Sequence, residues 1–155
     1  MTTDGLKLLF QYNHYAIGVN ARDLTHEESL LGPKPGGNCA NWVLGHIVQN
    51  RGAILELLGE QPVWNASDGD PYKRGSAPIA GGATAKPFPE ILEALDRSQE
   101  RLLAGLSRMR DSDLGSADTK GSRAAKLAGL QFHEAYHAGQ LGLLRRIAGR
   151  KGAIQ

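Results

Sequence analysis

The 155-residue sequence predicts an all-α fold, a four-helix bundle with a long connection between the second and third helices. Two observations carry this prediction. Four long segments place apolar residues three and four positions apart, which is the spacing of an amphipathic helix. No segment shows the strict alternation of a half-buried strand, so no sheet is expected. Helices with one apolar stripe bury that stripe against each other, and four of them favour a bundle.

The first helix is expected over residues 6–22. Its buried stripe is predicted to contain Leu6, Leu9, Phe10, Asn13, Ile17, Asn20 and Ala21. Thr25, with Glu28 three positions later, matches a capping box, which predicts a short helical turn ending near Leu31. The run GPKPGGN over residues 32–38 then predicts a loop, because glycine and proline interrupt regular structure.

The second helix is expected over residues 39–58, with Asn38 as its N-cap and Gly59 just past its end. Its inner stripe is predicted to contain Val43, His46, Ile47, Asn50, Ile54, Leu57 and Leu58. Gly45 and Gly52 each cost roughly 1 kcal/mol against alanine inside a helix. We therefore expect them to allow close packing or to leave room for another group.

The long connection covers residues 60–86 and shows neither helical nor strand periodicity. A loop of this length in a compact domain is usually functional or a flexible cover, and Trp64 and Tyr72 are expected to cover the mouth of a site. The third helix is expected to start at Pro87–Pro89, since proline suits a first turn. Its apolar stripe is predicted to contain Ile91, Leu92, Leu95, Leu102, Leu103, Leu106 and Met109.

The last helix is expected over residues 122–148, after a linker of turn-forming residues at 111–121. Its stripe is predicted to contain Leu127, Leu130, Leu141, Leu144 and Ala148, widened by Phe132, Tyr136, Leu143 and Ile147. Arg145, Arg146 and Arg150 are expected to be solvated charges, which suit the C-terminal end of a helix dipole.

Composition indicates one ordinary globular domain over residues 1–155 and excludes several function classes. The chain has 18 basic and 16 acidic residues, a formal net charge of +2, so we expect no nucleic-acid partner. It has neither a signal-peptide pattern nor the roughly 18 consecutive apolar residues of a membrane span. Cys39 is the single cysteine, so no intrachain disulfide can form and a reducing, cytoplasmic location is expected.

Three of the five histidines are expected to lie in the core. His133 and His137 are four residues apart on the last helix and therefore project from one face, the buried stripe. His46 lies on the inner stripe of the second helix. Three convergent imidazoles form a typical open transition-metal site. Core histidines that hydrogen-bond to other side chains remain the alternative, because buried imidazoles need partners of some kind.

The segment from His133 to His137 also spells H-E-x-x-H, the zinc metalloprotease motif. In that interpretation Glu134 is the general base and a third ligand lies downstream. Neither a histidine nor an acidic residue follows His137, and no edge strand is expected to bind a peptide. We therefore place Glu134 in a helix–helix salt bridge or behind the metal ligands.

Other residues give weaker expectations. Asn50 and Gln140 follow His46 and His137 by about one turn, so both are candidates for lining the site, with ordinary buried amides as the alternative. Four further residues carry expectations. His14 approaches the cavity or packs elsewhere, His26 is exposed, and Trp42 is core or cavity wall. Cys39 lies at a helix N-terminus, which can lower a thiol pKa, but too far from His46 to be a ligand.

Two blocks of sequence resemble the DinB/YfiT-like superfamily of bacterial helical-bundle proteins. The first is residues 41–47, NWVLGHI, and the second is residues 132–141, FHEAYHAGQL, followed by LLRR at 143–146. The spacing of the blocks and the predicted helices also match. The resemblance therefore covers nearly the whole chain and implies a DinB-like four-helix bundle.

The resemblance implies a divalent transition metal, nickel or zinc, bound by His46, His133 and His137. It also implies a thiol-dependent S-transferase or isomerase that acts on a small-molecule substrate, with a low-molecular-weight thiol as cosubstrate. A non-enzymatic metal-binding or stress-response bundle is the alternative, and a purely structural bundle is the third hypothesis. A homodimer is expected, both from the resemblance and because Ala94, Ala104 and Gly105 are small enough for close contact with a second chain.

Overall fold

The computed structural model describes residues 1–79, 84–116 and 119–154, and every regular element in these ranges is helical. The all-α prediction is therefore confirmed. The elements, in chain order, are α1 (Thr3–Ala21), α2 (His26–Ser29), α3 (Ala40–Leu57), α4 (Ala66–Gly69), the 3₁₀ helix η1 (Asp70–Tyr72), α5 (Phe88–Arg108), the 3₁₀ helix η2 (Asp111–Leu114) and α6 (Arg123–Ile147).

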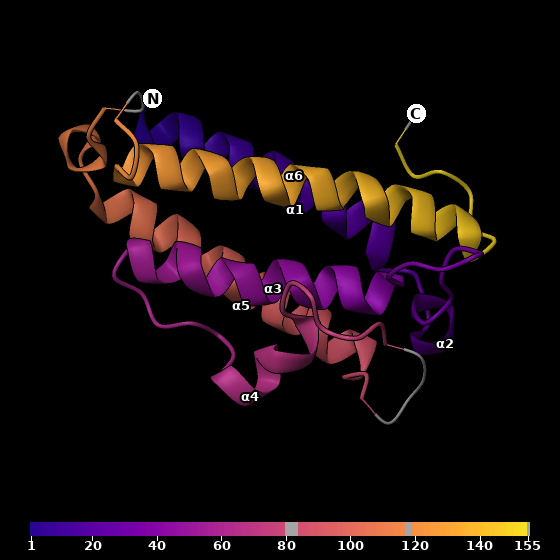
Figure 1. Ribbon diagram of the computed structural model, residues 1–155. Coiled ribbons are helices and arrows are strands. Elements are labelled where there is room, and N and C mark those ends of the chain that lie inside the picture. Colours follow the sequence, from indigo (N-terminus) through magenta and orange to yellow (C-terminus); the bar gives the residue numbers. More distant parts are fainter. Residues whose placement is uncertain (80–83, 117–118, 155) are drawn as a thin grey trace.

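The four long helices form a bundle of two layers (Figure 1). Helices α1 and α6 lie side by side in one layer, and α3 and α5 lie side by side in the other. Across the layers, α3 packs against α6 and α1 packs against α5. The packing of α3 against α6 matters most for function, because these helices carry the three histidines.

Most helix ends lie where capping chemistry predicts them. The Ser122 hydroxyl accepts a hydrogen bond from the Ala125 backbone N–H at the start of α6. Gly59 and Gly149 have φ of 75° and 83° just past the ends of α3 and α6, a conformation that favours glycine. The prediction of Asn38 as an N-cap is wrong: Cys39 occupies that position, and its side chain makes no capping hydrogen bond.

The stripe of the last helix is narrower than predicted. Its central residues Leu127, Leu141 and Leu144 are buried, but four residues expected to widen it are exposed: Phe132, Tyr136, Leu143 and Ile147. Leu9 of α1 is likewise exposed. In a bundle of two layers each helix keeps one face toward solvent. Apolar residues also occur on that face, so their spacing alone does not show that they are buried.

The C-terminal arginines were expected to be solvated charges, but two of them, Arg145 and Arg150, form ion pairs. Arg145 is 9% exposed and its guanidinium pairs with the Asp23 carboxylate, while Arg150 pairs with Glu28. These contacts tie the end of α6 to Asp23, which follows α1, and tie the residues after α6 to α2. None of the helices in the described part of the chain combines the length and apolar composition that a membrane crossing requires.

The connection between α3 and α5 is more ordered than its sequence suggests. Asn65 and Asp68 form a capping box that starts α4, a signal that the search for periodicity missed. Tyr72, at the end of η1, is fully buried. Its hydroxyl donates to the Asn41 side chain at 3.1 Å and accepts from the Lys86 backbone N–H at 2.8 Å. Within the predicted connection, residues 80–83 lie outside the described residues.

Gly45 allows the close packing that was expected of it. A Cβ atom at this position would lie 2.2 Å from Cδ1 of the Tyr72 ring. We expect Gly45→Ala to displace that ring and to lower the free energy of unfolding by about 1–3 kcal/mol, as overpacking does. Urea denaturation measures the change.

Gly129→Ala is the matched control, because no atom lies within 4 Å of the added Cβ in the middle of α6. Its expected effect is a gain of up to about 1 kcal/mol from helix propensity and reduced freedom of the unfolded chain. Equal effects of the two substitutions would show that Gly45 is not needed for packing.

Candidate metal centre

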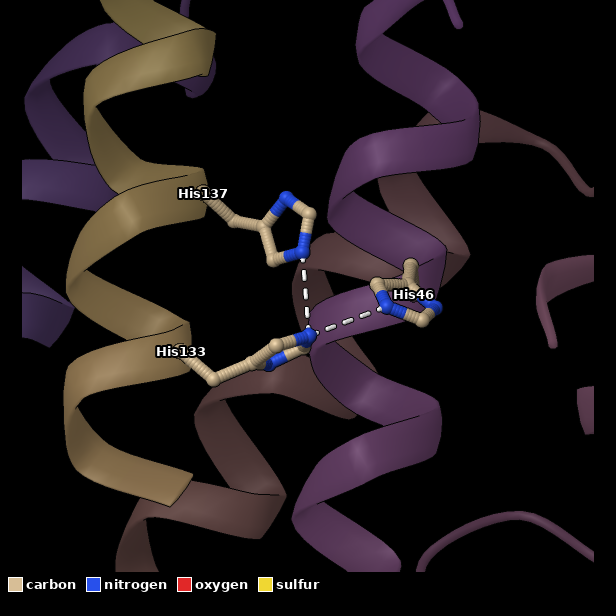
Figure 2. Close-up of side chains that lie close together, drawn as sticks. All are labelled: His46, His133 and His137. Carbon is tan, nitrogen blue, oxygen red and sulfur yellow. Dashed lines mark hydrogen bonds between the residues drawn. The ribbon is translucent and has the colours of Figure 1, made fainter. Parts of the chain in front are cut away.

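Two neighbouring helices bring three imidazole rings together. His46 comes from α3, while His133 and His137 come from successive turns of α6, and Figure 2 shows the three rings facing one another. The His133 Nε2 atom lies 3.2 Å from His46 Nε2 and 3.1 Å from His137 Nε2. One ligand atom from each residue falls within 4.8 Å of the others.

Hydrogen bonds at the other ring nitrogens orient two of these rings. His46 Nδ1 lies 2.6 Å from the Tyr72 backbone oxygen, and His137 Nδ1 lies 2.7 Å from Gln140 Oε1. A carbonyl oxygen can only accept, so both Nδ1 atoms carry the hydrogen. In the neutral rings the Nε2 atoms of His46 and His137 therefore carry lone pairs, and both atoms lie close to His133 Nε2. The Asn50 side-chain nitrogen also lies 3.1 Å from His46 Nε2.

This donor set fits a divalent transition metal. The unprotonated Nε2 atoms of His46 and His137 converge with His133 Nε2, so three nitrogen donors meet at one place. A cation among the three nitrogens satisfies every lone pair at once. Neutral imidazoles are common ligands for zinc and nickel, and a hydrogen bond at the second ring nitrogen is the usual support for such a ligand.

Burial keeps these imidazoles neutral. Burial is the largest cause that lowers the pKa of His46, His133 and His137 below the ordinary histidine value near 6.5. The charge of a neighbouring histidine lowers each pKa further. The rings are thus available as metal ligands at neutral pH.

The same shifts predict how the stability of the metal-free protein depends on pH. Because the folded pKa values lie below the unfolded value near 6.5, the unfolded chain binds more protons in that range. The free energy of unfolding is expected to reach its full value above about pH 6.5 and to fall as the pH drops below that. Urea midpoints at about pH 7.5 and about pH 5.5 test this, and an equal or higher midpoint at the lower pH would contradict it.

The predicted neighbours of the cluster lie beside it. Gln140 accepts from His137, and the Asn50 amide donates to the His46 backbone oxygen at 2.8 Å. Trp42 is both core and cavity wall: it is 6% exposed and stacks on the His46 ring with centroids 4.6 Å apart. Neither Trp64 nor Tyr72 lines the cluster's pocket: Trp64 packs against the buried Tyr72 ring and lines a separate pocket with Val48 and Gln49.

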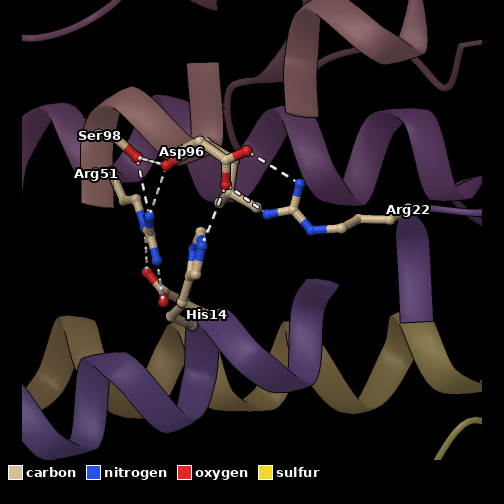
Figure 3. Close-up of polar contacts among 7 residues, drawn as sticks. His14, Arg22, Arg51, Asp96 and Ser98 are labelled. Atoms are coloured by element: carbon tan, nitrogen blue, oxygen red, sulfur yellow. Dashed lines mark hydrogen bonds and ion pairs between the residues drawn. The ribbon is translucent and has the colours of Figure 1, made fainter. Parts of the chain in front are cut away.

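Three other candidates lie outside the cluster. His14 Nε2 contacts the Asp96 carboxylate at 3.1 Å (Figure 3), and His14 is not part of the three-histidine cluster. His26 is half-buried and accepts from the Phe88 backbone N–H, so it is less exposed than expected. Burial raises the pKa of the Cys39 thiol, which overturns the expectation that the helix N-terminus lowers it.

Glu134 forms the helix–helix salt bridge expected of it. Its carboxylate accepts two hydrogen bonds of 2.8 Å from the Arg51 guanidinium, and both side chains are almost fully buried. Arg51 also donates to the Leu95 backbone oxygen and to Ser98 Oγ of α5 (Figure 3). With both oxygens bound to Arg51, Glu134 is not free to act as a protease base.

Two groups at the site were not found from the sequence. The Tyr72 backbone oxygen carries no sequence signal, because any residue supplies a carbonyl. Arg74 lines the pocket above the histidines and comes from the aperiodic connection. Arg51 did leave a signal: it is a charged residue four positions after Ile47 and three before Ile54, both on the inner stripe.

Comparison with known proteins gives a consistent result. A family model for the DinB superfamily matches residues 20–141. A solved structure described as a conserved protein of locus from Enterococcus faecalis has the same fold, with a TM-score of 0.68 at 16% identity. The alignment covers 94% of this chain and 96% of that one. No curated protein sequence matches the chain at a significant level.

Proposed function

Because the chain belongs to the DinB superfamily, we propose that it is a metal-dependent enzyme that holds a divalent ion, nickel or zinc, through His46, His133 and His137. One observation carries the proposal. The Nε2 atoms of three neutral imidazoles face one another, and the Nδ1 atoms of His46 and His137 are engaged by acceptors. Asn50 and Gln140 are assigned to the lining of the same site.

The proposed reaction is a thiol-dependent S-transfer or isomerisation of a small molecule, with a low-molecular-weight thiol as cosubstrate. The metal supplies a Lewis acid that favours anions and deprotonates a coordinating thiol. The chain supplies a pocket of about 510 Å³ beside the histidines. Trp42, Leu143 and Ile147 form part of its apolar wall, which restricts water around the substrate.

Turnover distinguishes this proposal from a non-enzymatic metal-binding or stress-response bundle. Zinc- or nickel-loaded protein is incubated with an electrophile and, in turn, mycothiol, bacillithiol and glutathione. Product formation that requires metal and is lost in His137→Ala supports the enzyme. Cys39→Ser is the control and is expected to retain activity, since the buried thiol lies outside the cluster. Stoichiometric metal binding without turnover with any thiol favours the alternative.

A two-fold homodimer and a cytoplasmic location belong to the same proposal. Of the small residues first expected at the interface, Ala104 is exposed, whereas Ala94 is fully buried and Gly105 packs on Leu58 within the chain. Exposed apolar side chains also lie on α1 and α6, and two of them, Tyr12 and Leu143, line one surface pocket shared by these helices. A patch of this kind supports an isologous interface on that face.

Light scattering at micromolar concentration tests the dimer. The wild type is expected to have the mass of two chains, and Tyr12→Glu, which places a charge in the patch, is expected to have the mass of one. A monomeric wild type would remove the dimer from the proposal without affecting the metal site.

A further inference from the structure

The pocket beside the histidines has an unusual charge distribution. It is about 510 Å³ in volume, and its walls include the apolar side chains of Trp42, Val43 and Leu144. Arg74 is the only residue with a formal charge among the residues that line it, since the histidines are neutral. No carboxylate lines the pocket. The Arg74 guanidinium therefore lies beside apolar walls and imidazoles, with no carboxylate in the pocket to balance its charge.

Arg74 also lacks a partner elsewhere in the described part of the chain. No ion pair or hydrogen bond involves its guanidinium there, and it is solvent-exposed. Its neighbours differ: Lys73 pairs with Asp70, and Lys86 pairs with Asp68. The acidic groups of the connection are thus already used, and Arg74 is left facing the pocket.

The charge of Arg74 does not suit metal binding by itself. Arg74 lines the same pocket as His46, His133 and His137. A fixed cation repels a second cation bound nearby. An anion in the pocket removes that conflict, because it is attracted by both charges.

The opposite side of His133 offers no such selectivity. A second pocket there, of about 630 Å³, is lined by Asn50, Glu56 and Lys126 among others. The negative charge of Glu56 offsets the positive charge of Lys126, so this pocket has no net preference for an anion. The anionic part of a ligand is therefore expected on the Arg74 side.

We propose that Arg74 is a specificity-determining residue that binds the carboxylate of a small, partly apolar substrate in the pocket beside the three histidines. Guanidinium and carboxylate match in a bidentate pair, and the apolar walls accept a hydrocarbon chain or ring. The ligand is the substrate or the thiol cosubstrate of the proposed reaction, so the assignment rests on the proposed function.

The test begins with metal-free protein, in which no metal can bind the carboxylate. Hexanoate and the neutral hexanamide are titrated into the wild type, Arg74→Gln and Lys73→Gln, with binding followed by NMR. Lys73→Gln is the matched control. It also removes one positive charge, at the neighbouring position, but the Lys73 side chain does not line this pocket.

Arg74→Gln is expected to weaken hexanoate binding roughly tenfold and to leave hexanamide unchanged, while Lys73→Gln changes neither by more than about twofold. Equal affinities of the wild type for the two ligands, or equal effects of the two substitutions, would overturn the assignment. Failure of zinc to bind would defeat the proposed function, but this titration would still decide the role of Arg74.

A second arm identifies which molecule carries the carboxylate. Zinc-loaded protein is titrated with 3-mercaptopropionate and with the neutral 2-mercaptoethanol. A preference for the acidic thiol that Arg74→Gln removes assigns the carboxylate to the cosubstrate. A preference seen only with hexanoate assigns it to the other substrate, and the absence of any Arg74-dependent preference in both arms overturns the proposal.

Discussion

Replacing Glu134 with alanine is expected to lower the free energy of unfolding by about 3–5 kcal/mol. The substitution leaves the Arg51 guanidinium, which is 0% exposed, without its carboxylate. Only the Leu95 backbone oxygen and Ser98 Oγ would remain as acceptors. An uncompensated buried charge is costly because little solvent can reach it. Urea denaturation of metal-free protein measures the loss.

Two further variants show whether burial of the pair causes the effect. Glu93→Ala breaks an exposed pair with Arg97, and its expected cost is below about 1 kcal/mol. The double variant Arg51→Met, Glu134→Leu removes both charges and is expected to recover most of the lost stability. A cost for Glu134→Ala as small as that for Glu93→Ala would show that the buried pair does not hold α3 against α6.

The second large effect is expected in metal affinity. His133 is the central member of the cluster, since its Nε2 lies within 3.2 Å of both other Nε2 atoms. His133→Ala is expected to weaken zinc binding by more than the roughly 10–100-fold that loss of an outer-shell partner costs. The fold should persist, because a chain of 155 residues buries a core without a metal. Competition with a chromogenic chelator measures the affinity, and circular dichroism checks the fold.

Substitutions nearby and elsewhere give a graded control. Gln140→Leu removes the acceptor of His137 Nδ1–H and is expected to cost about 10–100-fold in zinc affinity. His14→Ala and His26→Ala remove histidines outside the cluster and are expected to change nothing. If His133→Ala bound zinc as tightly as His26→Ala, the three imidazoles would not form the site.

The helices and the histidine cluster could be predicted from the sequence because both depend on local spacing. The period of three and four placed His46 on the inner face of α3, and the four-residue spacing placed His133 and His137 on one face of α6. Packing of α3 against α6 then brings these faces together. Periodicity alone did not show which apolar residues stay exposed, as Phe132 and Tyr136 do.

Contacts between segments distant in sequence could not be predicted in this way. The Tyr72 backbone carbonyl accepts a hydrogen bond from His46, and the identity of a side chain does not predict a backbone contact of this kind. Arg74 reaches the pocket from a connection without periodicity. The Arg51–Glu134 pair joins residues 83 positions apart, and only the charge of Arg51 on an apolar stripe hinted at a buried partner.

Elemental analysis of protein purified without a histidine tag tests the central claim most directly. We expect about one divalent transition ion per chain, nickel or zinc, in the wild type and almost none in His46→Ala. Protein that remains free of metal after dialysis against zinc, or a His46→Ala variant that retains the wild-type metal content, would contradict it.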